Sequence, residues 1–470
     1  MDRRGFLKSI AAAAATAGTL GSAVAVNERK PNIVIILADD QGYADASFNP
    51  AHPPEVHTPH MDALARSGVI CTNGYASGHV CSPTRAGLMT GLHQQRFGIY
   101  TAGQGGSGVP LDQKMFPLHL KPAGYVSGAF GKWHMGLTLE YNAINRGFDY
   151  FYGFMGRGAH DYFNLRRDYT GPFGTPLYRG LEQIDDNGYL TTRITEEAVA
   201  FIERNKNRPF FAYVAYNAVH APPEAPEEDI KLFNTGDKTR DTLMAMLKHL
   251  DLGVGKIIET LKKVGVYENT LVFYLGDNGG AKVMHANNAP LRGFKQDDYE
   301  GGIRVPFVVS WPGRIKPGTT CSVPVWSIDI LPTVLAATGL KPLPGTHPFD
   351  GKNMLPALDG RVDKLHDHLF WSSGDEGKWA VRSGDWKLVF FRGRKELFNL
   401  RDDLGETTDL SKTKPEKVKE LTDLYNAWLE EMADPVDPKA SKYWKPDAPA
   451  PRKKLSKEEK AKRRAKQRKN

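Results

Sequence analysis

The chain contains four unbroken apolar runs before residue 280, at residues 32–38, 125–130, 210–216 and 271–275. None of them shows the strict alternation of a strand with one face in water. Continuous apolar runs of this length are typical of strands that are buried on both faces of a mostly parallel sheet. The pattern therefore predicts the core of an α/β domain.

Polar side chains follow each of these runs within a few residues. In chain order they are Asp39 with Asp40, Lys132 with His134, Asn217 with His220, and Asp277 with Asn278. In open α/β sheets, ligands bind where the carboxyl ends of the strands meet. The four endings therefore predict one shared site at that edge of the sheet.

Helices are predicted between the strands, at residues 61–67, 85–92, 192–205, 240–264 and 330–338. The alternation of strands and helices favours a large, mostly parallel mixed sheet sandwiched by helices. After about residue 345 the pattern changes to short aromatic-rich segments separated by turn residues, at 369–371, 379–382, 386–391 and 396–399. These segments predict a smaller antiparallel sheet, and a helix over 415–432 is expected to pack on it.

The chain is accordingly divided into four parts. They are an export signal at 1–25, a large α/β domain at 28–345, an antiparallel-sheet subdomain with its helix at 346–434, and a Pro-rich and then basic tail at 435–470. The signal is of the twin-arginine type, because Arg3-Arg4 precedes an Ala-rich apolar stretch that ends at Ala25, where we expect cleavage. We therefore expect the twin-arginine machinery to export the folded chain to the periplasm or the extracellular space of a bacterium.

The apolar stretches and the charge distribution exclude two classes of partner. The signal is short for a membrane span and no later apolar segment is long enough, so an integral membrane protein is not expected. The net charge is +8, but residues 452–470 carry +9 and residues 1–25 carry +2, which leaves about −3 on the middle of the chain. No nucleic-acid partner is therefore expected. The tail is interpreted as a solvated charged helix, with a tether for polyanions as the alternative.

Three cysteines, Cys71, Cys81 and Cys321, are too few for a disulfide framework in a chain of 470 residues. A bridge between Cys71 and Cys321 stays open, although buried inert thiols are the commoner case. Around Cys81, Pro83 and the apolar spacing after it predict a helix that begins just after the cysteine. A helix N-terminus with Arg85 one turn later would favour a thiolate nucleophile, whereas the same cysteine taken alone is more often a packing residue.

Asp39, Asp40, Asp277 and Asn278 offer oxygen ligands from two separate strand ends. Hard oxygen donors suit calcium or magnesium rather than zinc. A single Asp after a strand is more often a helix cap, but two such pairs favour a metal site.

The order of these motifs resembles the formylglycine-dependent, type I sulfatases of the alkaline phosphatase superfamily. The segment from Cys81 to Arg85 resembles the CxPxR signature of that family, and the likeness extends from Asn32 to about Leu410. The other matching motifs are Asp39-Asp40-Gln41-Gly42, Gly131-Lys132-Trp133-His134, His220, Gly276-Asp277-Asn278-Gly279, Leu291-Arg292-Gly293-Phe294-Lys295, Glu300-Gly301-Gly302, Glu396-Leu397-Phe398-Asn399-Leu400 and Gly405-Glu406-Thr407. Several motifs in one order are far more specific than any single motif.

The resemblance implies a sulfuric ester hydrolase whose nucleophile is made from Cys81. A formylglycine-generating enzyme would oxidise Cys81 to an aldehyde, and the hydrate of that aldehyde would attack sulfur. One calcium ion is implied, with magnesium as the alternative, and its ligands would be Asp39, Asp40, Asp277, Asn278 and residue 81. Asp277 would also accept the proton of the attacking hydroxyl.

The resemblance also implies roles for the basic side chains. Lys132 and Lys295 would hold sulfate oxygens, and Arg85 would support the hydrated aldehyde. His220, with Lys295, would protonate the departing alcohol, and His134 would take a proton from the second hydroxyl so that sulfate is released. Taken singly, such lysines and histidines are more often surface or core residues. The histidines that lie in no such motif are assigned no role: His57, His79, His93, His119, His285 and His347.

Sulfated carbohydrate is the expected substrate, ahead of a small aryl sulfate, because the chain resembles exported relatives that desulfate polysaccharides. A phosphodiester or phosphonate monoester hydrolase with the same site is the alternative. Phe294 stands where relatives often carry glycine, and with Asp297 and Asp298 it is a candidate for shaping the leaving-group pocket. A polar cluster of Arg157, His160, Asp161, Arg166 and Arg167 is either a sugar or sulfate contact or an ordinary exposed loop.

Overall fold

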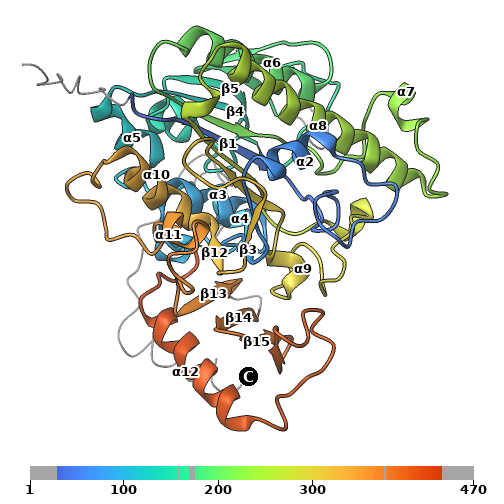
Figure 1. Cartoon of the computed structure of the whole chain (residues 1–470), viewed down its shortest axis with the longest axis vertical. Helices are drawn as coiled ribbons and strands as arrows, with labels where there is room; N and C mark the ends of the chain where they lie inside the picture. The colour runs from blue at the N-terminus through green and yellow to red at the C-terminus, as the bar shows by residue number, and fades with distance from the viewer. Residues whose placement is uncertain (1–28, 157, 169–174, 375–376, 437–470) are drawn as a thin grey trace, which may run out of the picture. The chain divides into compact units, whose positions relative to one another are not determined.

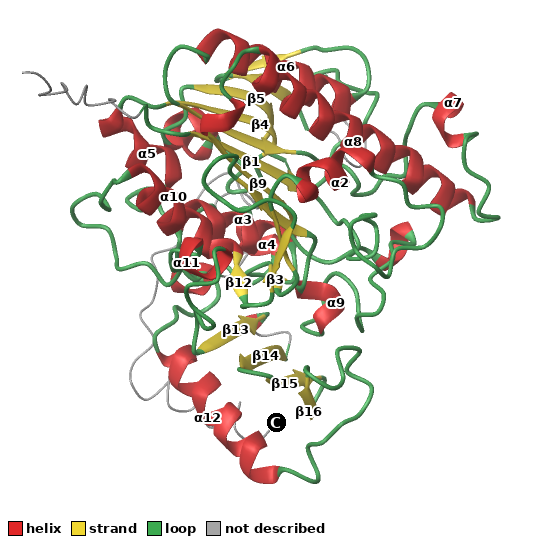
Figure 2. Cartoon of the chain, in the orientation of Figure 1, coloured by secondary structure: helices red, strands yellow, loops and turns green. Residues whose placement is uncertain are grey.

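The four apolar runs form the centre of a ten-stranded sheet (Figure 2). In the computed structural model the described residues are 29–156, 158–168, 175–374 and 377–436, so the predicted export signal and basic tail lie outside them. The described residues from Pro31 onward belong to one compact unit, which contains every element below. The strands of the large sheet are β1 (Asn32–Ala38), β2 (Val69–Cys71), β4 (Val126–Lys132), β5 (Tyr150–Phe154), β6 (Leu177–Arg179), β7 (Glu182–Ile184), β8 (Phe210–Ala215), β9 (Thr270–Gly276), β10 (Phe307–Ser310) and β11 (Thr319–Cys321).

The spatial order of these strands is β11-β2-β10-β9-β1-β8-β4-β5-β6-β7. The central strands β9, β1, β8, β4 and β5 are parallel to one another. β10 runs antiparallel to both of its neighbours, and β6 and β7 continue the far edge as antiparallel strands. The predicted mostly parallel mixed sheet is therefore confirmed, while the short edge strands and β5 were missed by the sequence pattern.

Both faces of the sheet are covered by helices (Figure 1). Side chains along β1 alternate between two cores, with Val34 and Ile36 in one and Ile33, Ile35 and Leu37 in the other. The first core includes side chains of α2 (Pro59–Arg66), α6 (Leu190–Asn205) and α8 (Lys238–Lys263). The second includes side chains of α3 (Cys81–Thr90), α5 (Phe116–Leu120) and α10 (Ile330–Thr338). Burial on both faces explains why the central strands are continuously apolar.

The remaining elements of the large domain are short. They are β3 (Gly74–Tyr75), β12 (Val325–Trp326), α4 (Ala102–Gly105), α7 (Glu227–Ile230), α9 (Glu300–Ile303) and α11 (Leu355–Leu358). No helix of the described residues is both long enough and apolar enough to cross a membrane. Cys71 and Cys321 are register partners in β2 and β11, and both are buried free thiols.

The C-terminal segment forms the predicted antiparallel sheet. Its strands are β13 (His368–Ser372), β14 (Lys378–Ser383), β15 (Trp386–Phe391) and β16 (Arg394–Asn399), followed by helix α12 (Pro415–Glu430). α12 buries Leu421, Tyr425 and Trp428 against one face of this sheet. Trp371, Val389 and Phe398 form a second cluster with Tyr75 and Trp326 of the large domain. One apolar face of the small sheet therefore packs on α12, and the other packs on the large domain.

A buried ion cluster links the small sheet to α9 of the large domain. The ammonium group of Lys387 in β15 lies 2.8 Å from Oε1 of Glu300 and 2.9 Å from Oε1 of Glu406, and all three side chains are buried. Burial, opposed by Lys387 and supported by Glu300, raises the pKa of Glu406 to about 7. Two carboxylates therefore share one buried cation, and one of them holds a proton more tightly than it would in the unfolded chain.

Replacing Glu406 with glutamine should flatten the pH dependence of stability. The folded pKa of Glu406 lies above its ordinary value of 4.5, so its stabilising contribution is complete below about pH 4.5 and is lost as the pH rises through 7. The full loss corresponds to roughly 3 kcal/mol. Denaturant unfolding of both proteins at several pH values from about 5 to 8 measures this. Equal slopes for the wild type and Glu406→Gln would contradict the assignment.

Candidate active site

The predicted site residues gather at the carboxyl edge of the parallel strands. β9, β1, β8 and β4 are neighbours in that order, so the residues that follow them lie side by side. The backbone ties these ends together, because Asp277 N donates to Ala38 O at 2.9 Å and Asp39 N donates to Ala218 O at 3.0 Å. Asp40 has a φ of 59°, a left-handed conformation that turns the chain away from the strand direction.

Carboxylates and cations pair closely at this edge. Lys132 Nζ contacts Asp39 Oδ2, and Lys295 Nζ lies 2.8 Å from Asp40 Oδ2. Nε2 of His220 lies 3.5 Å from the same oxygen of Asp40. Asn278 Nδ2 donates to Asp40 Oδ1 at 2.8 Å. Contacts from four segments therefore converge on two adjacent carboxylates.

Two sets of side chains offer atoms close enough to hold one metal ion. Asp39, Cys81 and Asp277 form one set and Asp39, Asp40 and His220 form the other, with ligand atoms within 4.8 Å of one another in each. Oδ1 of Asp39 and Oδ1 of Asn278 are buried and accept no hydrogen bond among the described residues. Buried polar atoms without a partner are rare in proteins, so these two oxygens suit a cation.

The electrostatics of the carboxylates differ from one to the next. Burial raises the pKa of Asp39 to about 6, against the lowering effect of Lys132 and Arg85. Burial and the neighbouring Asp39 raise the pKa of Asp277 to about 6. Burial would also raise the pKa of Asp40, but Lys295, His220 and Lys132 outweigh it and hold that pKa below its ordinary value. Among these three carboxylates, the negative charges of Asp39 and Asp277 are thus the ones that nearby cations offset least.

Cys81 is the first residue of α3 and is almost fully buried. The helix was predicted to begin just after the cysteine; it begins at Cys81 itself because Val80 is extended and precedes the first turn. Burial would raise the pKa of the thiol, but Lys132 and Lys295 outweigh it and lower that pKa. Residue 81 therefore faces the positive end of a helix as well as two lysines.

Arg85 is fully buried, and its guanidinium group donates hydrogen bonds to other groups of the protein. Its Nε and one terminal nitrogen donate to Asp277 Oδ2 at 3.0 and 2.8 Å, and the other terminal nitrogen donates to Lys132 O at 2.7 Å. The guanidinium group thus fixes Asp277 relative to the end of β4. One terminal nitrogen of Arg85 also lies 3.7 Å from Oδ2 of Asp39, so the charged partners of Arg85 are Asp277 and Asp39.

The predicted acid, His220, and the predicted base, His134, differ in burial and in hydrogen bonding. His220 is 16% exposed at its side chain, and its Nδ1 lies 2.7 Å from Ala221 O. His134 is buried, has a φ of 55°, and has no hydrogen-bond partner at Nδ1 among the described residues. Ser82 of the cysteine signature donates to His134 O at 2.8 Å, which ties that turn to α3. Burial lowers the pKa of both histidines.

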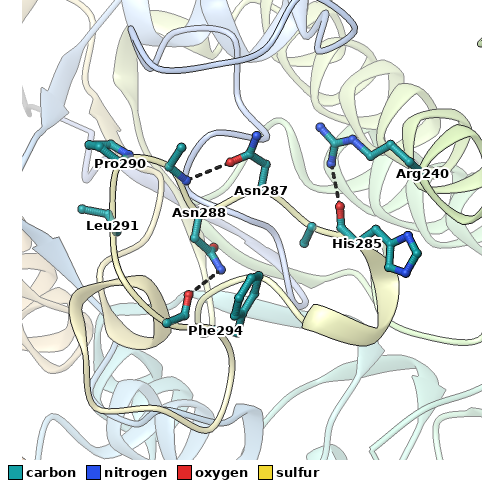
Figure 3. Close-up of a pocket in the computed structure, with 10 residues that line it drawn as sticks. Arg240, His285, Asn287, Asn288, Pro290, Leu291 and Phe294 are labelled. Carbon is teal, nitrogen blue, oxygen red and sulfur yellow. Dashed lines mark hydrogen bonds between the residues drawn. The ribbon is translucent and has the colours of Figure 1, made fainter. Parts of the chain in front are cut away.

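The loop after β9 carries Lys295 and borders a cavity of about 400 Å³ (Figure 3). Phe294 lines this cavity together with Arg240, His285 and Asn287, whereas none of the predicted catalytic residues does. Phe294 therefore shapes a cavity and immediately precedes Lys295 in the chain.

The polar cluster after residue 156 does not form one patch. His160 and Asp161 are buried, while Arg166 and Arg167 are exposed and pair with Asp168 and Asp185. Arg157 lies outside the described residues.

Comparison with known proteins identifies the family of the chain. A family model described as Sulfatase matches residues 31–340. The chain belongs to the sulfatase family. It is thus a sulfuric ester hydrolase of the type I sulfatases in the alkaline phosphatase superfamily. A second model, described as N-sulphoglucosamine sulphohydrolase, C-terminal, matches residues 294–434 of this sulfatase. The family generally uses a metal ion and formylglycine.

Two relatives show how far the likeness extends. Human N-acetylgalactosamine-6-sulfatase is 32% identical over 399 residues, which cover 79% of this sulfatase and 73% of the human protein. The uncharacterized sulfatase YdeN of Escherichia coli (strain K12) is 28% identical over 500 residues and covers 87% of each chain. Both alignments extend beyond the large domain.

The fold also matches solved structures. Ps i-CgsB in complex with k-i-k-neocarrahexaose superposes with a TM-score of 0.82 at 36% sequence identity, over 87% of this sulfatase and 94% of that chain. The phosphonate monoester hydrolase of Agrobacterium radiobacter superposes with a TM-score of 0.63 at 21% identity, over 86% of this sulfatase and 95% of that chain. The second likeness concerns the fold alone.

Proposed function

We propose that this sulfatase removes sulfate from sulfated carbohydrate, using a formylglycine made from Cys81 and a bound calcium ion. The observation that carries the proposal is the convergence of Asp39, Asp277 and Lys132 on residue 81. Magnesium is the alternative ion. The phosphodiester or phosphonate monoester reaction is the alternative activity, and the shared fold with the phosphonate hydrolase favours testing it.

The residues present fit a hard cation. Asp39, Asp40, Asp277, Asn278 and residue 81 would hold it, and the unpartnered oxygens of Asp39 and Asn278 support this ligand set. When bound, calcium would neutralise negative charge and lower the pKa of a hydroxyl on residue 81. Asp277, held by two hydrogen bonds from Arg85, is placed to take the proton of that hydroxyl.

The lysines would bind the sulfate group of the substrate. The ammonium groups of Lys132 and Lys295 contact Asp39 and Asp40, and both act electrostatically on the thiol of residue 81. Cations in a buried site stabilise charge that develops during transfer far better than cations in water do. Lys132 and Lys295 would therefore hold the sulfate oxygens while the bond to the sugar oxygen breaks.

The histidines would move protons on the two sides of the reaction. His220, partly exposed and close to Lys295 through Asp40, would deliver a proton to the sugar oxygen as it leaves. The formylglycine hydrate carries two hydroxyls on one carbon, so one can attack sulfur and the other can lose its proton to expel sulfate. His134 would take that second proton. A serine at this position would lack the second hydroxyl.

The carbohydrate substrate and the location of the enzyme rest on different observations. A human relative is named for N-acetylgalactosamine-6-sulfate, and a structural relative is seen with an oligosaccharide. A twin-arginine export signal at residues 1–25 supports a periplasmic or extracellular enzyme that is modified before export. Partners would thus include the formylglycine-generating enzyme and the export machinery.

The choice between sulfate and phosphate chemistry is open to a direct test. Turnover of an aryl sulfate and of the matching aryl phosphodiester should favour the sulfate by at least about 100-fold in kcat/KM, which corresponds to about 3 kcal/mol of discrimination in the transition state. The measurement uses the same protein preparation for both esters. A preference for the phosphodiester would overturn the proposed activity in favour of the alternative.

A further inference from the structure

His79 and Asp298 form a buried pair that belongs neither to the proposed catalytic residues nor to the proposed metal ligands. Nδ1 of His79 lies 3.0 Å from Oδ1 of Asp298, and the two side chains are 2% and 1% exposed. Neither oxygen of Asp298 accepts a hydrogen bond of good geometry from any described residue, so its contact with His79 is a close polar contact. Burying a polar side chain with so few hydrogen-bond partners is unfavourable. A pair kept at that cost is a candidate for a functional role.

The pair connects the two segments that bring residue 81 and Lys295 together. His79 precedes Cys81 by two residues, and Asp298 follows Lys295 by three. Gln296 N also donates to His79 O at 2.9 Å. His79 therefore holds the Lys295 loop twice, once by its backbone and once by its side chain.

Lys295 lies between two fixed points of this loop. Its own N–H donates to Gly280 O at 3.0 Å, and the next residue, Gln296, has a φ of 77°. A residue other than glycine is strained in this left-handed region, and neighbouring contacts must offset the strain. The contacts of His79 are made directly after this turn. They therefore fix the direction in which the Lys295 side chain leaves the loop toward Asp40.

We propose that the His79–Asp298 pair is a positioning device that sets the place of the Lys295 ammonium group relative to residue 81. The pair is too deeply buried to touch substrate, so it acts through Lys295. The inference rests on the proposed role of Lys295 in binding the sulfate group. A misplacement of about 1 Å in such a group costs up to roughly 100-fold in rate.

A double-mutant cycle tests the inference. Asp298→Asn keeps the shape of the side chain but replaces one carboxyl oxygen by an amide nitrogen, and it should lower kcat/KM for an aryl sulfate by about tenfold. In a Lys295→Ala background the same change should have less than about a twofold effect. Equal losses in both backgrounds, or no loss in either, would overturn the proposal, because independent structural damage is additive.

Controls separate positioning from folding and from modification. His366→Asn breaks another buried His–Asp contact, at 2.8 Å to Asp329, and should lower the melting temperature without any coupling to Lys295. The mass of the peptide that contains residue 81 shows whether each variant is modified to the same extent. If Asp298→Asn is too unstable, the apolar pair His79→Phe with Asp298→Leu replaces it, because apolar residues of similar volume often replace a buried polar pair without loss of the fold.

A second readout separates this inference from the proposed function. Affinity for inorganic sulfate, measured by calorimetry on the same four proteins, should fall severalfold on Asp298→Asn only when Lys295 is present. A wild type that turns over no sulfate ester would overturn the proposed function, whereas this binding cycle would still report on the pair. Additive sulfate affinities would overturn the positioning role whatever the substrate.

Discussion

Replacing Cys81 with alanine is expected to abolish sulfatase turnover and to leave the fold intact. Loss of a nucleophile in other hydrolases costs about six orders of magnitude in kcat, and a loss of at least about four orders is expected here. The side chain is small and begins α3, so its removal opens little space in the core. Initial rates on an aryl sulfate, together with a thermal melt of the same sample, measure both halves of the prediction.

Cys81→Ser is the matched control for this variant. Serine offers one hydroxyl at the same position, so at most a single turnover is expected before the enzyme stops. The melting temperatures of both variants should lie within a few degrees of the wild type. Sustained turnover by Cys81→Ala would refute the assignment of residue 81 as the nucleophile.

Removal of the bound cation is expected to have the next largest effect. Asp39 and Asp277 are buried close together, and the pKa of each is raised to about 6, so a divalent cation would relieve a real electrostatic cost. Chelation should lower turnover by more than about 100-fold, and calcium should restore it. Calcium should also raise the melting temperature of the metal-free protein, because a ligand that binds only the folded state stabilises it.

Asp39→Asn and Asp45→Asn form the matched pair for this experiment. Both carboxylates are buried, but Asp45 pairs with Arg240 at 2.7 Å rather than facing residue 81. Asp39→Asn should lose the calcium-dependent rise in melting temperature, and Asp45→Asn should keep it. Full turnover in protein shown to be free of divalent metal, or an unchanged calcium response in Asp39→Asn, would contradict the proposed ligand set.

The clustering of the site could be predicted from the sequence because parallel strands place their carboxyl ends at one edge. Asp39, Lys132, His220 and Asp277 each follow a long apolar run, and those four strands are neighbours in the sheet. The short aromatic-rich segments after residue 345 likewise predicted the antiparallel subdomain. In both cases the strand faces that are buried in the fold produce the apolar or aromatic pattern that is visible in the sequence.

Other features could not be predicted in this way. Lys295 lies in a loop without strand or helix periodicity, and only its motif identified it. The His79–Asp298 contact joins segments that are far apart in the chain, and neither residue has a local signal. The strands β2, β10 and β11 on one side of the large sheet are short, so the tertiary pairing rather than the apolar pattern defines them. Arg85 was expected to support residue 81, and its hydrogen bonds to Asp277 became visible only in three dimensions.

The most direct test of the central claim is the mass of the proteolytic peptide that contains residue 81, taken from active enzyme produced in its native host. The account predicts a mass below that of the cysteine peptide, by the difference between a thiol-bearing methylene group and an aldehyde, together with reactivity toward a hydrazide reagent. An intact thiol at residue 81 in fully active protein would contradict it.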